Sequence, residues 1–87
     1  MARQSPQKIT EKVRLEFQDM PEHIRNVAIH LSHKFSGLSL KEIGKGFGIR
    51  ESAVSQASRR FESAISEKAR LRKKVEKVRE ELNLSNV

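Results

Sequence analysis

Hydrophobic residues recur along the chain at spacings of three and four positions, which is the period of an α-helix. No stretch alternates apolar and polar residues for long enough to form a β-strand. The pattern therefore predicts an all-α fold of four to five helices, in a single domain that spans residues 1–87.

The first two helices have start signals as well as periodicity. Ser5 followed by Pro6 begins a helix whose apolar face comprises Ile9, Val13 and Phe17. Asp19 is expected to cap a second helix over about 21–35, because a proline and an acidic residue follow it at the required positions. The core-facing residues of this second helix are Ile24, Val27, Ala28, Leu31 and Phe35, and Gly37 follows as a left-handed C-terminal cap.

A third, short helix is predicted to begin after Ser39, because Ser39 and Glu42 have the spacing of a capping box. Gly48 is expected to take a positive φ in a tight turn, so this helix ends near 46 or 47. Another helix starts at Glu51. Two helices joined by a short turn at about 39–62 have the layout of a helix-turn-helix, whose second helix (about 51–63) enters the major groove of DNA.

Apolar residues continue from 54 to 82 in a heptad pattern that Lys68 interrupts. One arrangement that fits is a single helix of about 32 residues, which overhangs the domain and self-associates through the 54–82 heptads. The other has a break near 63–66, with Ser66 capping a C-terminal basic helix (66–83) that folds back over the first two helices. We favour the break, because Lys68 weakens the seam and a small domain needs apolar cover.

The outward face of the helix that begins at 51 is unusually small and polar. With Val54, Ala57 and Phe61 facing the core, helical geometry places Ser52, Ser55, Gln56, Arg59 and Ser63 on the opposite side. A solvated helix face usually carries long, mixed charges, whereas side chains of these types fit against base edges. We therefore expect Ser52, Ser55, Gln56 and Arg59 to contact bases.

Basic residues lie on either side of this polar stripe, where contacts to phosphate would be made. The expected phosphate contacts are Ser39, Lys41, Lys45, Arg50 and Arg60. A further basic run, from 68 to 74, is equally consistent with an ordinary solvated face.

The stretch from Pro21 to Phe61 resembles the C-terminal DNA-binding domain of the bacterial replication initiator DnaA, a Trp-repressor-like helix-turn-helix. The matching residues are Pro21, Ala28, Leu31, Ser39, Leu40, Glu42, Ile43, Gly44, Phe47, Gly48, Val54, Ala57 and Arg59. A closer resemblance is to the DnaA-like tail of proteins related to REP-associated tyrosine transposases, in which segments similar to GLSLKEIG, FGI and SAVSQASRRF recur.

The resemblance implies that Ser52, Ala53 and Gln56 face bases; for Ala53 it is the sole basis of the expectation. It also implies a bacterial protein of the cytoplasm, associated with the nucleoid. One difference is clear: the initiator's Asp-His-Thr-Thr signature is replaced by Arg50, Glu51, Ser52 and Ala53.

Composition supports the same partner and excludes several other classes. The 87 residues carry a formal charge of +7, which favours double-stranded DNA as the partner over a membrane or a small-molecule substrate. The chain has no Cys and no Tyr, and its residues assemble no catalytic set; His30 and His33 lack a third metal ligand. We expect no enzyme activity, cofactor or metal. A sigma-factor-like promoter-reading module and a helix-mediated protein-interaction module are the alternatives.

Overall fold

The computed structural model describes residues 5–82, and every regular element in that range is a helix. In chain order the elements are α1 (Pro6–Glu16), the short 3-10 helix η1 (Pro21–His23), α2 (Ile24–Phe35), α3 (Leu40–Phe47), α4 (Glu51–Glu67) and α5 (Ala69–Glu81). The prediction of an all-α fold with four to five helices is confirmed. No helix in the described range is long and apolar enough to cross a membrane.

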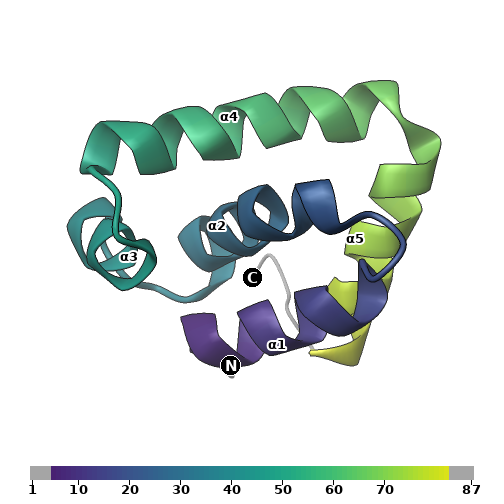
Figure 1. Cartoon of the computed structure of the whole chain (residues 1–87), viewed down its shortest axis with the longest axis horizontal. Coiled ribbons are helices and arrows are strands. Elements are labelled where there is room, and N and C mark those ends of the chain that lie inside the picture. Colours follow the sequence, from purple (N-terminus) through teal and green to yellow (C-terminus); the bar gives the residue numbers. More distant parts are fainter. Residues whose placement is uncertain (1–4, 83–87) are drawn as a thin grey trace.

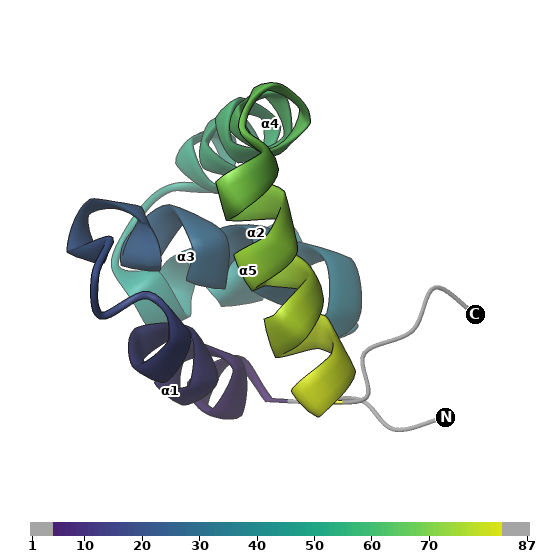
Figure 2. The ribbon, with the colours of Figure 1, turned by 90° about the vertical axis from the view of Figure 1, so that its right-hand side faces the viewer.

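Helix α2 lies at the centre of the arrangement (Figure 1). It packs against α4 on one side and α1 on the other, while α3 and α5 lie at opposite ends of α4. Figure 2 shows α5 running from the end of α4 toward α1. The last helix therefore folds back over the domain, as the sequence predicted.

The larger of two hydrophobic clusters joins four helices. Its buried residues are Ile9 and Val13 from α1, Phe17 directly after α1, Val27 and Leu31 from α2, Phe61 from α4, and Leu71, Val75 and Val78 from α5. Each of these side chains is at most 4% exposed. Because α5 supplies a third of them, it completes the core around α1, which α2 alone would leave partly uncovered.

A smaller cluster lies under α3. Ile29 of α2, Ile43 of α3 and Val54 of α4 are its buried members. The half-buried apolar side chains packed around them are Leu38, Leu40, Phe47, Ile49 and Ala57. This cluster fixes α3 against the first half of α4, and it has no buried residue in common with the larger one.

The local helix signals are confirmed at the starts of α1 and α3 and after the ends of α2 and α3. Ser5 caps α1 with its hydroxyl, and Ser39 forms a capping box in which its Oγ accepts from the Glu42 amide at 3.2 Å. Gly37 and Gly48 have φ values of 76° and 70°, a left-handed conformation that costs glycine little. Each of these features depends on neighbouring residues only.

The predicted cap at Asp19 is wrong. The second helix begins instead with η1, and Met20 precedes it without a side-chain cap. The Asp19 carboxylate accepts hydrogen bonds from Lys74 and Arg70, which lie more than 50 positions away in the sequence. Two cations from α5 thus bind the side chain that the local pattern assigned to the helix start.

The break before the last helix exists but lies later than predicted. Ser66 remains inside α4, and its hydroxyl donates to the carbonyl oxygen of Ser63 at 3.0 Å instead of capping a new helix. The chain turns at Lys68, whose backbone is extended (φ −119°, ψ 106°), and α5 begins at Ala69. Lys68 is exposed, so the turn buries no charge.

Five apolar residues of the 54–82 heptads are buried within this chain, and the other three, Ala57, Ala64 and Leu82, are half-buried. Val54 is fully buried in the smaller cluster, whereas Phe61, Leu71, Val75 and Val78 belong to the larger one. The long overhanging helix, the alternative that the heptads also permitted, is not the arrangement of the described residues. These side chains therefore form no exposed seam.

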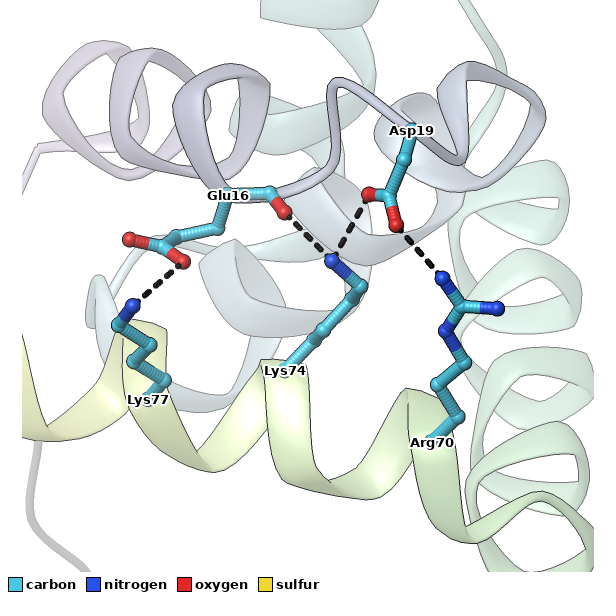
Figure 3. A network of polar contacts seen from close by, with 5 residues as sticks. All are labelled: Glu16, Asp19, Arg70, Lys74 and Lys77. Atoms are coloured by element: carbon cyan, nitrogen blue, oxygen red, sulfur yellow. Dashed lines mark hydrogen bonds and ion pairs between the residues drawn. The ribbon is translucent and has the colours of Figure 1, made fainter.

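Polar contacts fasten α5 to the end of α1 (Figure 3). Asp19 pairs with Arg70 at 2.9 Å and with Lys74 at 2.8 Å. The Lys74 ammonium also donates to the backbone oxygen of Glu16 at 3.0 Å, and Lys77 lies 3.5 Å from the Glu16 carboxylate. The hydrogen bond from Lys74 is the main cause that lowers the pKa of Asp19. Three of the six basic residues of α5 are thus paired with acidic side chains of the protein.

Candidate nucleic-acid interface

Helices α3 and α4 are joined by only three residues, Gly48 to Arg50, and form what we call the α3–α4 unit (residues 40–67). The connection is tight because the Ile49 amide donates to the Gly44 carbonyl at 2.8 Å. A Cβ atom on Gly44 would lie 2.5 Å from the Ile49 carbonyl oxygen. Gly44 is therefore a contact point between the two helices, a role that the sequence pattern did not reveal.

The outward face of α4 contains the predicted base-contacting residues. Figure 1 shows α4 along one edge of the molecule, with its outer side uncovered by other helices. The exposed side chains on this helix include Ser52, Gln56, Arg59 and Ser63. Ala53 and Ser55 are half-buried, because each lies about 100° to one side of the buried Val54. The four exposed side chains thus form the polar stripe, and Ala53 and Ser55 lie on its flanks.

The predicted phosphate contacts divide into two groups. Lys41 and Lys45 on α3, with Arg50 and Arg60 at α4, are exposed. Ser39 is exposed too, but its hydroxyl is occupied by the capping box, in which it also lies 3.1 Å from Glu42 Oε1. A carboxylate at this distance repels phosphate, so the geometry favours the four cations over Ser39.

The cations of the α3–α4 unit, like several others in the described part of the chain, form no ion pair there. The ion pairs among residues 5–82 join Lys12 to Glu81, Lys34 to Glu62, Arg70 and Lys74 to Asp19, and Lys77 to Glu16. None of them includes Lys41, Lys45, Arg50, Arg59 or Arg60. The positive charge beside the polar stripe is therefore not neutralised by close carboxylates, and it is available to an anionic partner.

A buried polar cluster supports α4 from beneath. Ser58 is 4% exposed, and its hydroxyl lies 3.1 Å from His30 Nδ1 and 3.3 Å from His33 Nδ1. A hydroxyl has one proton, so if it donates to one ring, the other ring must be the donor of its own bond. Burial lowers the pKa of His30, which favours its neutral form.

Sequence reasoning missed Ser58, although a signal was present. Ser58 lies four positions after Val54 and three before Phe61, which is a core-facing register. A small polar residue in that register requires a hydrogen-bond partner, and the buried His30 and the exposed His33 of α2 supply it. Both imidazoles therefore act as structural groups. No group of three or more potential metal ligands occurs among the described residues.

The unit as a whole presents a short, solvent-facing helix surface of small polar groups, one amide and one guanidinium, beside cations that form no ion pair within residues 5–82. Hydrogen-bonding groups of this kind match the donor and acceptor pattern of base edges, and the cations match the phosphate backbone. Neither a protein-family model, nor a curated protein, nor a solved structure matches the chain.

Proposed function

We propose that this protein is a sequence-specific double-stranded DNA-binding module in which α4 lies in the major groove and α3 supports it. The observation that carries the proposal is the position of the charge: within residues 5–82 the exposed cations of the α3–α4 unit form no ion pair, whereas Arg70, Lys74 and Lys77 of α5 each pair with Glu16 or Asp19 at the end of α1. The cations of the α3–α4 unit flank a stripe whose side chains are short enough for close approach to base edges.

Gln56 is the central residue of the proposed readout. Its exposed amide offers a donor and an acceptor together, which suits N6 and N7 of adenine. Arg59 lies about one turn further along α4 and is long enough to reach a guanine or a phosphate. Lys41 and Lys45 lie on α3, so they bind phosphates and carry no sequence information.

The proposed setting follows from the resemblance to DnaA-like tails. The module would serve a transposase-like or replication-initiator-like bacterial protein, either as its DNA-binding tail or as a free-standing copy, on DNA of the nucleoid. In this proposal the module has no catalytic role, because binding to DNA requires no nucleophile, general base or metal ion.

The test is a selection of binding sites from random duplexes, followed by fluorescence anisotropy with the selected and a scrambled duplex. Gln56→Ala should weaken binding to the selected duplex by about 5- to 150-fold, equivalent to about 1–3 kcal/mol, and should reduce its preference over the scrambled one. Lys41→Ala should weaken both duplexes alike and lower the salt slope by about 0.9.

Gln18→Ala is the matched control, because Gln18 is an exposed glutamine outside the α3–α4 unit. It should leave both affinities unchanged. An unaltered ratio of selected to scrambled affinity in Gln56→Ala would show that this face of α4 does not read the major groove. Absence of salt-dependent duplex binding by the parent chain would reject the proposal altogether.

A further inference from the structure

A cavity of about 310 Å³ lies between α2, α4 and α5, toward the end of α4 that is remote from α3. Its apolar lining comes from all three helices: Leu31 and Phe35 of α2, Ile65 of α4 and Val75 of α5. The volume is at the lower end of the range for small-molecule sites. The cavity therefore has the size and the lining of a site for a compact apolar group.

Arg79 gives this cavity a specific polar group. Its guanidinium carbon lies 5.1 Å from the centre of the Phe35 ring, so the planar group is held against an aromatic face. Its Nε is buried and has no hydrogen-bond partner among the described residues. A buried N–H without an acceptor is unfavourable, and an anion that entered the cavity would supply the missing acceptor.

The charges around the cavity favour an anionic occupant. Lys34 and Glu62 neutralise each other at 2.7 Å. The remaining charged residues that line the cavity are two cations, Arg72 and Arg79, and one carboxylate, Glu76. None of these three forms an ion pair within the described residues. One net positive charge remains beside an apolar lining.

The larger cavity between α1 and α3, of about 520 Å³, lacks this combination. It is lined by two acidic side chains, Glu11 and Glu42, and by one basic side chain, Arg14. None of the residues that line it carries a buried polar side-chain atom without a partner. The buried Nε of Arg79, which has no partner among the described residues, thus distinguishes the cavity of α2, α4 and α5.

We propose that this cavity binds a small organic anion with a flat apolar body, whose carboxylate or sulfonate accepts hydrogen bonds from the Arg79 guanidinium. The fork of guanidinium N–H groups matches a planar carboxylate with two parallel hydrogen bonds. The apolar body would lie against Phe35, Ile65 and Val75. The proposal does not depend on DNA binding, because none of the lining residues is a proposed DNA contact.

The test uses two fluorescent probes with the same apolar skeleton: the anion 1-anilinonaphthalene-8-sulfonate and the neutral N-phenyl-1-naphthylamine. The parent chain should bind one equivalent of the anion. Arg79→Met retains an unbranched apolar side chain without the charge, and it should weaken the anion at least about tenfold while changing the neutral probe by less than about twofold.

Lys73→Met is the matched control, because Lys73 is an exposed cation of α5 that does not line the cavity. It should leave the anion affinity within about twofold of the parent value. Amide chemical shifts should change at 30–35 and 72–79 when the anion is added. Circular dichroism melts of each variant establish that the compared proteins are folded.

The proposal would be overturned if the parent bound no anion at about 1 mM probe, or if the parent and Arg79→Met bound it with equal affinity. It would also be overturned by equal losses of anion affinity in Arg79→Met and Lys73→Met, or by chemical-shift changes confined to α1 and α3. Loss of the neutral probe in Arg79→Met would also reject it, because charge would not then determine binding.

Discussion

The close approach of Gly44 to the turn after α3 makes one substitution pair especially informative. In Gly44→Ala, the new Cβ would lie 2.5 Å from the Ile49 carbonyl oxygen and 3.4 Å from a methyl group of Val54. The Ile49 oxygen belongs to the backbone, so α3 and α4 must separate by roughly 1 Å to restore van der Waals contact. In Gly46→Ala the new Cβ meets no atom within 4 Å.

The two substitutions share the same helix and the same gain in helix propensity, about 1 kcal/mol. For Gly46→Ala we expect this gain alone, a stabilisation of about 0.5–1 kcal/mol. For Gly44→Ala, overpacking costs about 1–3 kcal/mol, and a weakened hydrogen bond from Ile49 to Gly44 costs about 1 more. After subtraction of the propensity gain, the expected net destabilisation is about 1–3 kcal/mol.

Urea denaturation followed by circular dichroism measures the difference, because the chain contains no Trp or Tyr for fluorescence. The two variants should differ by about 1.5–4 kcal/mol in unfolding free energy, or by about 6 °C or more in Tm. Equal stability of Gly44→Ala and Gly46→Ala would refute the inference that the Gly44–Ile49 contact sets the spacing of α3 and α4.

Two other stability predictions follow from burial. Burial lowers the pKa of His30 below its unfolded value of about 6.5, so between these two values the unfolded chain binds more protons. Unfolding free energy should therefore fall as pH decreases from 7.5 to 5.5, and a fall of the same size in His30→Leu would contradict this. Leu71→Ala should cost about 2–5 kcal/mol in urea denaturation because Leu71 is fully buried, whereas Leu15→Ala, at a site 62% exposed, should change stability by less than about 0.5 kcal/mol. Similar losses in both leucine variants would argue against the packing of α5 on the core.

The features that sequence reasoning predicted well are those that neighbouring residues determine. The caps at Ser5 and Ser39 and the positive φ of Gly48 need only the local chain. Asp19 also has a local signal, but two α5 cations that arrive only in the folded chain bind its carboxylate. A single sequence gives no indication of that pairing.

Within the candidate site, helical periodicity placed Gln56 and Arg59 on an exposed face, and the structure agrees. The same periodicity could have identified Ser58 as a buried residue, because its register is that of the core. Periodicity could not identify the histidines as its partners, since that depends on how α2 packs against α4. The role of Gly44 likewise depends on the distance between two helices, which composition and spacing do not specify.

The division of the apolar residues into two clusters has a consequence for the order in which the protein loses structure. The larger cluster ties together residues from both ends of the described chain, so opening any of its helices disrupts all of them. Helix α3 has only eight residues, and the smaller cluster packs it against α2 and α4. We therefore expect it to open as a separate local unit, at a free energy below that of global unfolding. A ligand that requires α3 in place would bind only the closed population, and its measured affinity would include the free energy of closing that unit.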